Sequence, residues 1–381
     1  MKTLSLHDYI SPTSEIIEEA RAGRMFILVD DEDRENEGDL VIPAQFATTE
    51  AVNFMARHAR GLICLAMTAQ RVQQLGLSLM SAHNRSRHAS AFTVSIEARH
   101  GISTGISAAD RARTIAVAIN SENPREEIAT PGHIFPLAAR DGGSLVRAGH
   151  TEAAVDVSRL AGLNASGVIC EVMNEDGTMS RLPELVAFAQ RHNLKLGTIA
   201  DLIQYRRRTE KLVFRSFETW TGDLEGGDWA VKVFEDRLTQ TEHIALVKGD
   251  LAAPGPSLVR VHSVDPVTDL LGPGRRALAA SSRIIAEAGR GVIVLLRDNQ
   301  QGAVARKLDV KEAARTEDHV LRQYGIGAQI LIDLGVKDMI LLTNHPRSLI
   351  ALEGFGLNII DQLPFAERPG DASELGAETG L

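Results

Sequence analysis

Short apolar runs and amphipathic stretches alternate along the first half of the chain. The runs "MFILV" (25–29) and "LVIPA" (40–44) predict buried strands, and "FTVSIEA" (92–98) alternates apolar and polar positions as a half-buried strand does. Residues 108–120 and 151–162 carry apolar side chains at helical spacing. The pattern therefore predicts a domain that mixes strands and helices.

Beyond residue 211, strand-like and helical stretches begin to alternate again. The stretch "HIALVKGDL" (243–251) predicts a strand, and "RRALAASSRIIAEAG" (275–289) predicts a helix that leads into the apolar run "VIVLL" (292–296). Three consecutive arginines, 206–208, precede this second half. We interpret them as a solvated helix end beside a domain boundary, because cations are favoured at a helix C-terminus.

The length of 381 residues and the apolar content of 44% suit two domains that each bury a core. We expect the first domain at 1–206, where strand-like and helical stretches follow one another. The second is expected at 212–366, with an α/β-type fold. The polar residues 367–381 predict a flexible tail.

Charge and hydropathy exclude several kinds of partner. A net charge of −9 and a pI near 5.8 argue against a general nucleic-acid binder, which needs Lys and Arg to meet phosphates. The longest apolar run has about six residues, far below the ~20 that span a bilayer. Cys64 and Cys170 lie in apolar contexts and predict reduced, buried thiols. We therefore expect a cytoplasmic protein without nucleic-acid or membrane partners.

An acidic stretch interrupts the first two predicted strands. Seven of the ten residues in 30–39 are acidic. Such a run commonly forms a solvated loop. A calcium-binding EF-hand loop starting at Asp31 would need Gly and Glu where this chain has Asn36 and Ile42. A magnesium or manganese site is the third interpretation, favoured by the position of the run between strands, since hard cations bind carboxylates and keep room for a substrate's oxygens.

Three further features carry candidate chemistry. The stretch "GGSLVRAGHTEA" (142–153) puts Arg147 and His150 at a predicted helix N-terminus, which suits an anion but also describes a glycine-rich turn with a capping threonine. In "TPGHIFPL" we expect a turn at Pro131 that fixes His133 for proton transfer or leaves it as a surface histidine. Glu171 lies in an apolar strand, where alternation alone leaves open whether it faces solvent or is buried.

The first domain resembles the 3,4-dihydroxy-2-butanone 4-phosphate synthase family of riboflavin biosynthesis. The resemblance covers roughly residues 5–205 and is carried, in the family's order and spacing, by "DDEDRENEGDL", "STGISAADR", "TPGHIFPL", "RAGHTEAAVDVSRLAGL" and "GVICEVMNEDGTMSR". It implies a single α+β domain with a mixed sheet and helices. Family members work as homodimers, with sites at the subunit interface. The implied substrate is D-ribulose 5-phosphate, and the implied cofactor is Mg²⁺ or Mn²⁺.

The implied reaction gives L-3,4-dihydroxy-2-butanone 4-phosphate and formate. It resembles an enolisation followed by dehydration, a 1,2-shift and the loss of one carbon. Each stage develops negative charge on oxygens beside a carbonyl, and a chelating divalent metal lowers that cost as a Lewis acid.

The matching motifs also imply roles for individual residues. The implied metal ligands are Glu35 and His150. The implied substrate contacts are Arg34 and Asp39 to the sugar, and Arg147, Ala148, Gly149, His150 and Thr151 to the phosphate, with Glu35 and Glu171 also at the substrate. The implied catalytic residues are His133 and Glu171, which handle protons, together with Glu35. The other acids, Asp30, Asp31, Glu32, Asp33 and Glu37, would make the pocket negative without individual steps. One stretch departs from the family, because residues 83–91, "HNRSRHASA", are basic and histidine-rich.

The second domain resembles GTP cyclohydrolase II. The resemblance rests on "HIALVKGDL", "VRVHS", "QYGIGAQILIDLGV", "LLTNHPR" and "ALEGFGLNII". Active members bind zinc through three cysteines, and the matching positions here are Asp265, Arg276 and Leu278. The family's "QEGRGIGL"-like catalytic loop is replaced by "RDNQQGAV". The sequence therefore predicts a domain that keeps the fold and lacks cyclohydrolase activity.

Several alternatives stay open for the second domain and for the whole chain. The domain could support or regulate the synthase, or bind a nucleotide or flavin at the pocket that corresponds to the cyclohydrolase active site. A compensating metal site from His262, Asp265 and Asp269 is disfavoured, because the other catalytic parts are also lost. The alternative for the whole chain is a bifunctional enzyme with residual GTP cyclohydrolase II activity. A non-enzymatic sugar-phosphate-binding regulator would require an inactive first domain, which the intact set of candidate site residues disfavours.

Overall fold

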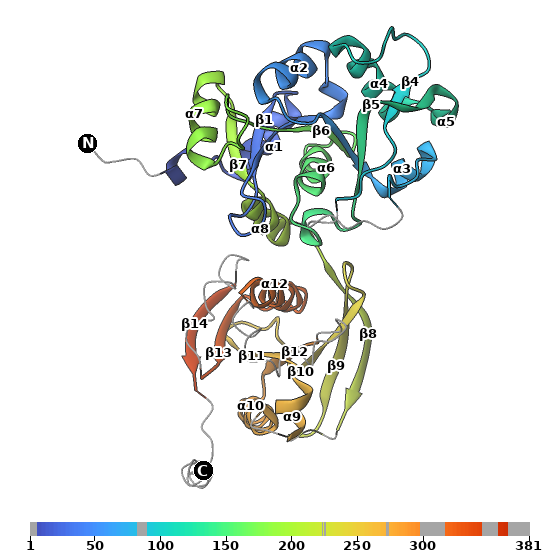
Figure 1. The fold of residues 1–381 in the computed structure, drawn as a ribbon. Coiled ribbons are helices and arrows are strands. Elements are labelled where there is room, and N and C mark those ends of the chain that lie inside the picture. The colour runs from blue at the N-terminus through green and yellow to red at the C-terminus, as the bar shows by residue number, and fades with distance from the viewer. Residues whose placement is uncertain are drawn as a thin grey trace, which may run out of the picture. The chain divides into compact units, whose positions relative to one another are not determined.

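The computed structural model divides into two compact units. It describes residues 6–81, 90–222, 224, 226–271, 274–297, 317–344 and 357–364. Contacts between Cα atoms separate residues 1–206 from residues 207–381. Within the described part of the chain, each unit holds one seven-stranded sheet (Figure 1).

The sheet of the first unit is mixed. Its strand order is β4-β5-β3-β6-β2-β1-β7. The strands are β1 (Phe26–Val29), β2 (Gly38–Pro43), β3 (Cys64–Thr68), β4 (Ile96–Ala98), β5 (Ile128–Ala139), β6 (Ser166–Glu171) and β7 (Lys195–Thr198). β1 pairs antiparallel with β2 and parallel with β7, and β3 pairs parallel with β5 and antiparallel with β6. The predicted mixed sheet is confirmed.

Helices cover both faces of this sheet (Figure 1). The α-helices are α1 (Thr13–Arg21), α2 (Thr49–Phe54), α3 (Ala69–Leu75), α4 (Ala108–Asn120), α5 (Pro124–Glu127), α6 (His150–Leu160), α7 (Leu182–His192) and α8 (Ile199–Thr209). Shorter turns are the 3₁₀ helices η1 (Leu6–Tyr9), η2 (Ala44–Phe46) and η4 (Gly143–Leu145), and the π-helix η3 (Met55–Ala59).

Alternate residues of the central strands enter two separate cores. In β1, Ile27 and Val29 pack with α2, α3, α4 and α7, whereas Phe26 and Leu28 pack with α1, α6 and α8. Successive side chains of a strand point to opposite faces, so both faces of β1 are apolar. This explains why "MFILV" is a continuous apolar run. Cys64 and Cys170 are buried, free thiols, as predicted, and burial raises the pKa of both.

The turn predicted at Pro131 is wrong, because β5 continues through this stretch. In the β4–β5 pair, Ile96 faces Ile134, but the next residue, Glu97, faces Ala129. Residues 130–133 therefore bulge out of the β4 register without ending the strand. Pro131 and Gly132 do interrupt the β4–β5 pairing, as their residue types indicate, but they form a bulge and not a turn.

The second unit repeats the layered arrangement with a different topology. Its strand order is β14-β13-β11-β12-β10-β9-β8. The strands are β8 (Val213–Thr221), β9 (Trp229–Asp236), β10 (Thr241–Lys248), β11 (Ser257–Ser263), β12 (Gly291–Leu296), β13 (Asp338–Leu342) and β14 (Asn358–Leu363). The described helices are α9 (Pro266–Leu271), α10 (Gly274–Ala288) and α12 (Glu317–Asp333). No helix in the described ranges is long and apolar enough to cross a membrane.

Some predicted features lie outside the described residues. These are most of the basic loop at 83–91, the stretch "RDNQQGAV" beyond Arg297, and the tail at 367–381.

Candidate active site

The acidic stretch forms the connection between β1 and β2, and Asp30 organises it. Asp30 Oδ2 accepts hydrogen bonds from Arg34 Nη1 at 2.7 Å and from the Glu35 amide at 3.2 Å. Its Oδ1 accepts from the Glu37 amide at 2.8 Å. The Asp30 side chain is fully buried, whereas residues 31–33 are exposed. The run therefore divides into a solvated outer part and an inward part that the Asp30 carboxylate holds in shape.

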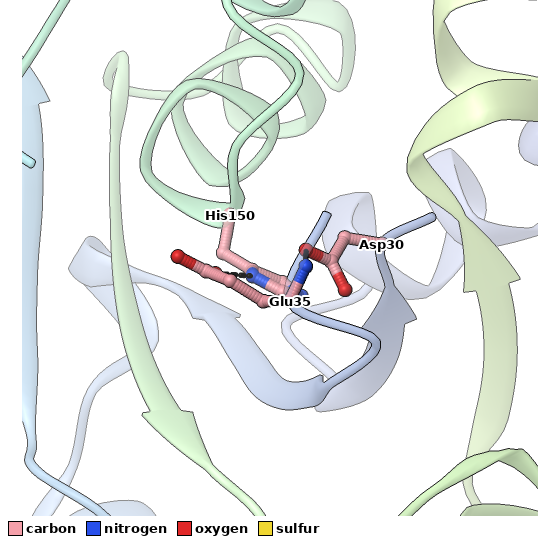
Figure 2. Close-up of side chains that lie close together, drawn as sticks. All are labelled: Asp30, Glu35 and His150. Carbon is pink, nitrogen blue, oxygen red and sulfur yellow. Dashed lines mark hydrogen bonds and ion pairs between the residues drawn. The ribbon is translucent and has the colours of Figure 1, made fainter. Parts of the chain in front are cut away.

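Helix α6 brings His150 against this loop. Gly149 precedes the helix with extended backbone, and a Cβ there would lie 2.3 Å from an Arg147 nitrogen. His150 Nε2 lies 3.2 Å from the carbonyl oxygen of Leu28, and Nδ1 lies 3.9 Å from Glu35 Oε2. Figure 2 shows the His150 ring and the Glu35 side chain lying side by side, with Asp30 next to them.

The donors of this cluster fit a divalent cation. One ligand atom each from Asp30, Glu35 and His150 lies within 4.8 Å of the others. Burial lowers the pKa of His150, so the neutral imidazole that ligates metals is favoured. When Nε2–H donates to the Leu28 carbonyl, the Nδ1 lone pair faces Glu35, which is the arrangement of a metal-bound histidine with its second nitrogen held. Carboxylate ligands suit Mg²⁺ or Mn²⁺, and the neutral imidazole adds one nitrogen ligand.

The three cluster members differ in how far their atoms are already engaged. Both Asp30 oxygens accept hydrogen bonds from the loop. Glu35 Oε2 contacts Arg34 Nη1 at 2.6 Å. This contact joins two side chains and does not involve the backbone of the loop. Glu35 and His150 are therefore the better ligand candidates, and Asp30 supports the loop that presents Glu35.

A cross-strand row of side chains continues from the cluster along the sheet. Leu28 of β1 faces Asp39 of β2, which faces Glu171 of β6. Asp39 is buried, and its Oδ1 has no hydrogen-bond partner among the described residues, although His150 Nε2 lies 3.9 Å away. Burial, then the charge of Glu171, raises the pKa of Asp39 well above its usual value. An unpaired buried acceptor is costly, so Asp39 is poised for a donor such as a sugar hydroxyl.

The strand alternation also shows to which face of the sheet Glu171 points. Its neighbour Ile169, two residues earlier, packs in the core of α1, α6 and α8, so Glu171 shares the face on which α6 lies. Glu171 Oε2 accepts a hydrogen bond from the Leu62 amide at 2.8 Å. A Cβ on Gly61 would lie 2.3 Å from the Glu171 carbonyl oxygen, so glycine is needed for this close approach.

Arg147 lies beside the N-terminus of α6, where the first backbone N–H groups and the helix dipole favour an anion. Its Nη1 contacts Glu152 Oε2 at 2.6 Å, and its Nη2 donates to Ser90 Oγ at 3.0 Å. Glu152 is buried and also accepts from the Arg140 amide. These contacts fix the guanidinium next to Ala148, Gly149 and Thr151.

His133 lies on β5, the strand beside β3. Cys64 of β3 pairs with Phe135 of β5, two residues after His133. The fold thus gathers Arg34, Glu35, Asp39, His150 and Glu171. His133 Nδ1 instead contacts Glu97 Oε1 at 2.6 Å.

Sequence reasoning missed three supporting acids. It gave Asp30 no individual role and did not single out Glu97 or Glu152. Glu97 carried only a weak signal, its place on the polar side of the alternating stretch 92–98. Glu152 carried the pattern of an acid in the first turn of a helix, which usually indicates only a favourable dipole contact.

Family models match both units. The model of 3,4-dihydroxy-2-butanone 4-phosphate synthase matches residues 14–205, and the model of GTP cyclohydrolase II matches residues 218–364. A 3,4-dihydroxy-2-butanone 4-phosphate synthase of Pseudomonas aeruginosa is 48% identical over 363 residues, which cover 93% of this chain and 99% of that protein.

Two solved structures resemble the chain. RibBX from A. baumannii, a two-domain 3,4-dihydroxy-2-butanone 4-phosphate synthase, is 41% identical with a TM-score of 0.75 and covers 94% of this chain and 100% of that one. A 3,4-dihydroxy-2-butanone 4-phosphate synthase in complex with two magnesium ions is 39% identical with a TM-score of 0.51, covering 52% of this chain and 98% of that one. The chain therefore belongs to the 3,4-dihydroxy-2-butanone 4-phosphate synthase family, lyases of riboflavin biosynthesis, and carries a GTP cyclohydrolase II-like domain after its synthase domain.

Proposed function

We propose that the first unit converts D-ribulose 5-phosphate into L-3,4-dihydroxy-2-butanone 4-phosphate and formate with Mg²⁺ or Mn²⁺ held by Glu35 and His150. The observation that carries this proposal is the meeting of Glu35 Oε2 and His150 Nδ1, 3.9 Å apart, beside the unpaired Asp39 Oδ1. When bound, the cation would stabilise negative charge on substrate oxygens as a Lewis acid. The magnesium complex of a related synthase supports this choice of metal.

The remaining site residues divide the substrate between them. Arg34, next to Glu35 in the chain, would contact a sugar hydroxyl together with Asp39, whose buried Oδ1 has no donor among the residues that the structure describes. The substrate's phosphate would lie at the N-terminus of α6, between the Arg147 guanidinium and the backbone of 148–151. This arrangement orients the carbon chain across the row that contains Glu171.

Proton transfer would fall to Glu171 and His133. Glu171 lies beside Asp39 across the β2–β6 pair and can exchange a proton with the carbon or hydroxyl that the metal ligands face. The His133 side chain contacts Glu97 and none of these site residues within the described part of the chain. A homodimer in which each site combines residues of two chains would bring the two groups together.

We propose that the second unit does not open GTP. Both cysteines of the chain, Cys64 and Cys170, belong to the first unit, so the three thiolates of a cyclohydrolase zinc site are lacking. The unit would instead support or regulate the synthase. Binding of a nucleotide or flavin at the pocket that corresponds to the cyclohydrolase active site is the second candidate, because the family match extends over residues 218–364.

A formate-release assay of the full chain tests both proposals. We expect formate from ribulose 5-phosphate with Mg²⁺, loss of turnover after chelation with EDTA, and recovery on adding Mg²⁺ or Mn²⁺. Full turnover by EDTA-treated protein would refute the metal assignment. With GTP as the only substrate we expect no formate, and GTP-dependent formate would make the enzyme bifunctional. Titration calorimetry with GTP and with flavin mononucleotide then tests the binding alternative, which the absence of heat with both would remove.

A further inference from the structure

The contact between Glu97 and His133 is a carboxylate–imidazole pair that spans two strands. Glu97 lies on β4 and His133 on the bulged part of β5, with His133 Nδ1 2.6 Å from Glu97 Oε1. The Glu97 side chain is 19% exposed, whereas the His133 side chain is 42% exposed. An ionised carboxylate only accepts hydrogen bonds, so Nδ1 must carry the proton. The other ring nitrogen, Nε2, is thereby left to act as acceptor or acid.

The local backbone is built around this pair. The β4–β5 register changes between Ile96 and Glu97, and this change sets the 130–133 bulge against Glu97. The Gly132 amide donates to Ser95 Oγ at 3.1 Å. A Cβ on Gly132 would lie 2.1 Å from the Ile96 carbonyl, so only glycine lets the two strands approach this closely. The position of His133 is thus fixed from both strands.

A loop closes over the other side of the pair. Asp110, in the first turn of α4, accepts hydrogen bonds from Ser103 Oγ at 2.7 Å and from the Gly105 amide at 3.0 Å. Gly105 has a φ of +88°, and a Cβ there would lie 1.3 Å from Glu97 Oε1 and 2.7 Å from His133 Nδ1. The tethered loop therefore lies directly against the Glu97–His133 contact.

We infer that Glu97 is a positioning residue of the synthase, which holds His133 in the Nδ1–H tautomer so that Nε2 faces the substrate. The inference rests on the proposed role of His133 in proton transfer. Glu97 touches no substrate atom. Its carboxylate orients the imidazole and stabilises the imidazolium when Nε2 takes up a proton. The stretch "STGISAADR" contributes through Asp110, which holds Gly105 against the pair.

The test compares Glu97→Gln and Glu97→Leu with His133→Asn in the full, Mg²⁺-loaded chain. Removing the outer-shell partner of a metal-bound histidine typically costs 10–100-fold, and we take the same order for the partner of His133. We expect Glu97→Leu to lower kcat by about that factor with KM changed less than about twofold, and Glu97→Gln, which retains an acceptor, to recover part of the loss. Glu126→Gln, an exposed acid on α5, is the matched control and should keep the wild-type kcat.

A spectroscopic readout separates positioning from simple structural support. In ¹⁵N-histidine NMR spectra, with the His133 signals assigned by their loss in His133→Asn, we expect the Nδ1–H tautomer in the wild type and Glu97→Gln. In Glu97→Leu the signals should shift towards Nε2–H. Wild-type kcat or an unchanged tautomer in Glu97→Leu would overturn the inference. Wild-type kcat in His133→Asn would instead refute the role of His133 itself. Should Glu97→Leu fail to fold, the kcat and tautomer of Glu97→Gln against Glu126→Gln decide, and a kcat equal to the control's would overturn the inference.

Discussion

The two units differ in whether the polar side chains at their strand ends have hydrogen-bond partners. In the first unit, Asp39 keeps a buried carboxylate oxygen without a hydrogen-bond partner among the described residues, and other carboxylates crowd around it. In the second unit, His262 at the end of β11 has Nε2 within 3.0 and 2.9 Å of the two Asp269 oxygens. The Asp265 amide also donates to Asp269 at 2.9 Å. In the described part of the chain, Asp39 Oδ1 thus has no donor, whereas the Asp269 carboxylate has its donors in His262 and the Asp265 amide.

This difference indicates how much each of the two family matches says about function. Unsatisfied buried acceptors are costly and are kept where a ligand completes them, so the first cluster points to binding. The second cluster holds α9 against β11 without any ligand. The retained stretch "QYGIGAQIL" of α12 has a similar explanation, because Ile326, Ala328 and Ile330 pack in the core of the second unit. Its Gln329 hydrogen-bonds the backbone of residues 207, 210 and 212.

The largest expected effect follows from removing a metal ligand. Glu35→Ala should lower the rate of formate release from ribulose 5-phosphate by about 10³-fold or more, since metal stabilisation of developing charge is worth several kcal/mol. Glu32→Ala, an exposed acid of the same loop, is the control and should retain most of the rate. Circular dichroism should show both variants folded. A Glu35→Ala rate within tenfold of wild type would contradict the assignment.

Mixing two inactive variants then tests whether one site uses two chains. Glu35→Ala and His133→Asn protein, unfolded and refolded together, form hybrid dimers in which one of two shared sites is intact. We expect about a quarter of the wild-type rate, since half of the dimers are hybrids. If each site used one chain only, the mixture would stay as inactive as its components.

The next effect concerns the second cluster. Asp269→Ala leaves the buried His262 without its acceptor and should lower the free energy of unfolding of the second unit by about 1–3 kcal/mol. Both tryptophans, Trp220 and Trp229, lie in this unit, so urea unfolding followed by tryptophan fluorescence reports on it selectively. Glu287→Ala, an exposed acid on α10, is the control. A fluorescence transition equal to the control's would mean that the pair does not stabilise the unit.

Local patterns predicted much of the fold. The helix predicted at 108–120 is α4 residue for residue, because Ser107 caps it by accepting from the Asp110 amide. The acidic run does connect two strands, as the flanking apolar runs indicate. The failure at Pro131 has a physical reason, since a β-bulge and a turn need the same backbone freedom and only the partner strand distinguishes them.

The sequence indicated which residues belong to the site, but it did not indicate how they are arranged in space. Glu35 and His150 are far apart in the chain and meet only because α6 packs on the β1–β2 pair. The face of Glu171 depends on the β6 register, which alternation does not supply. Glu97 had no sequence feature that named His133 as its partner, because that pairing arises from the register change in β4 and β5.

The smallest expected effect is a change in the stability of the first unit when Asp39 is replaced. Burial and neighbouring carboxylates raise the pKa of Asp39 in the folded chain. A carboxyl whose pKa is raised by folding contributes stability below its ordinary pKa of 3.8 and loses it as the pH rises towards the folded value. Asp39→Asn removes this loss, so the metal-free variant should be more stable than the wild type at pH 7, and the difference should vanish near pH 3–4.

The expected gain is on the order of 1 kcal/mol, or about 2–4 °C in Tm, the scale of one unsatisfied buried polar group. Thermal unfolding in EDTA followed by circular dichroism would measure it, and formate release should fall in the same variant. Removing a carboxylate would then stabilise the first unit at the cost of turnover, whereas Asp269→Ala would destabilise the second. An Asp39→Asn protein less stable than wild type at pH 7 would mean that Asp39 is already satisfied, and the contrast between the two clusters would be lost.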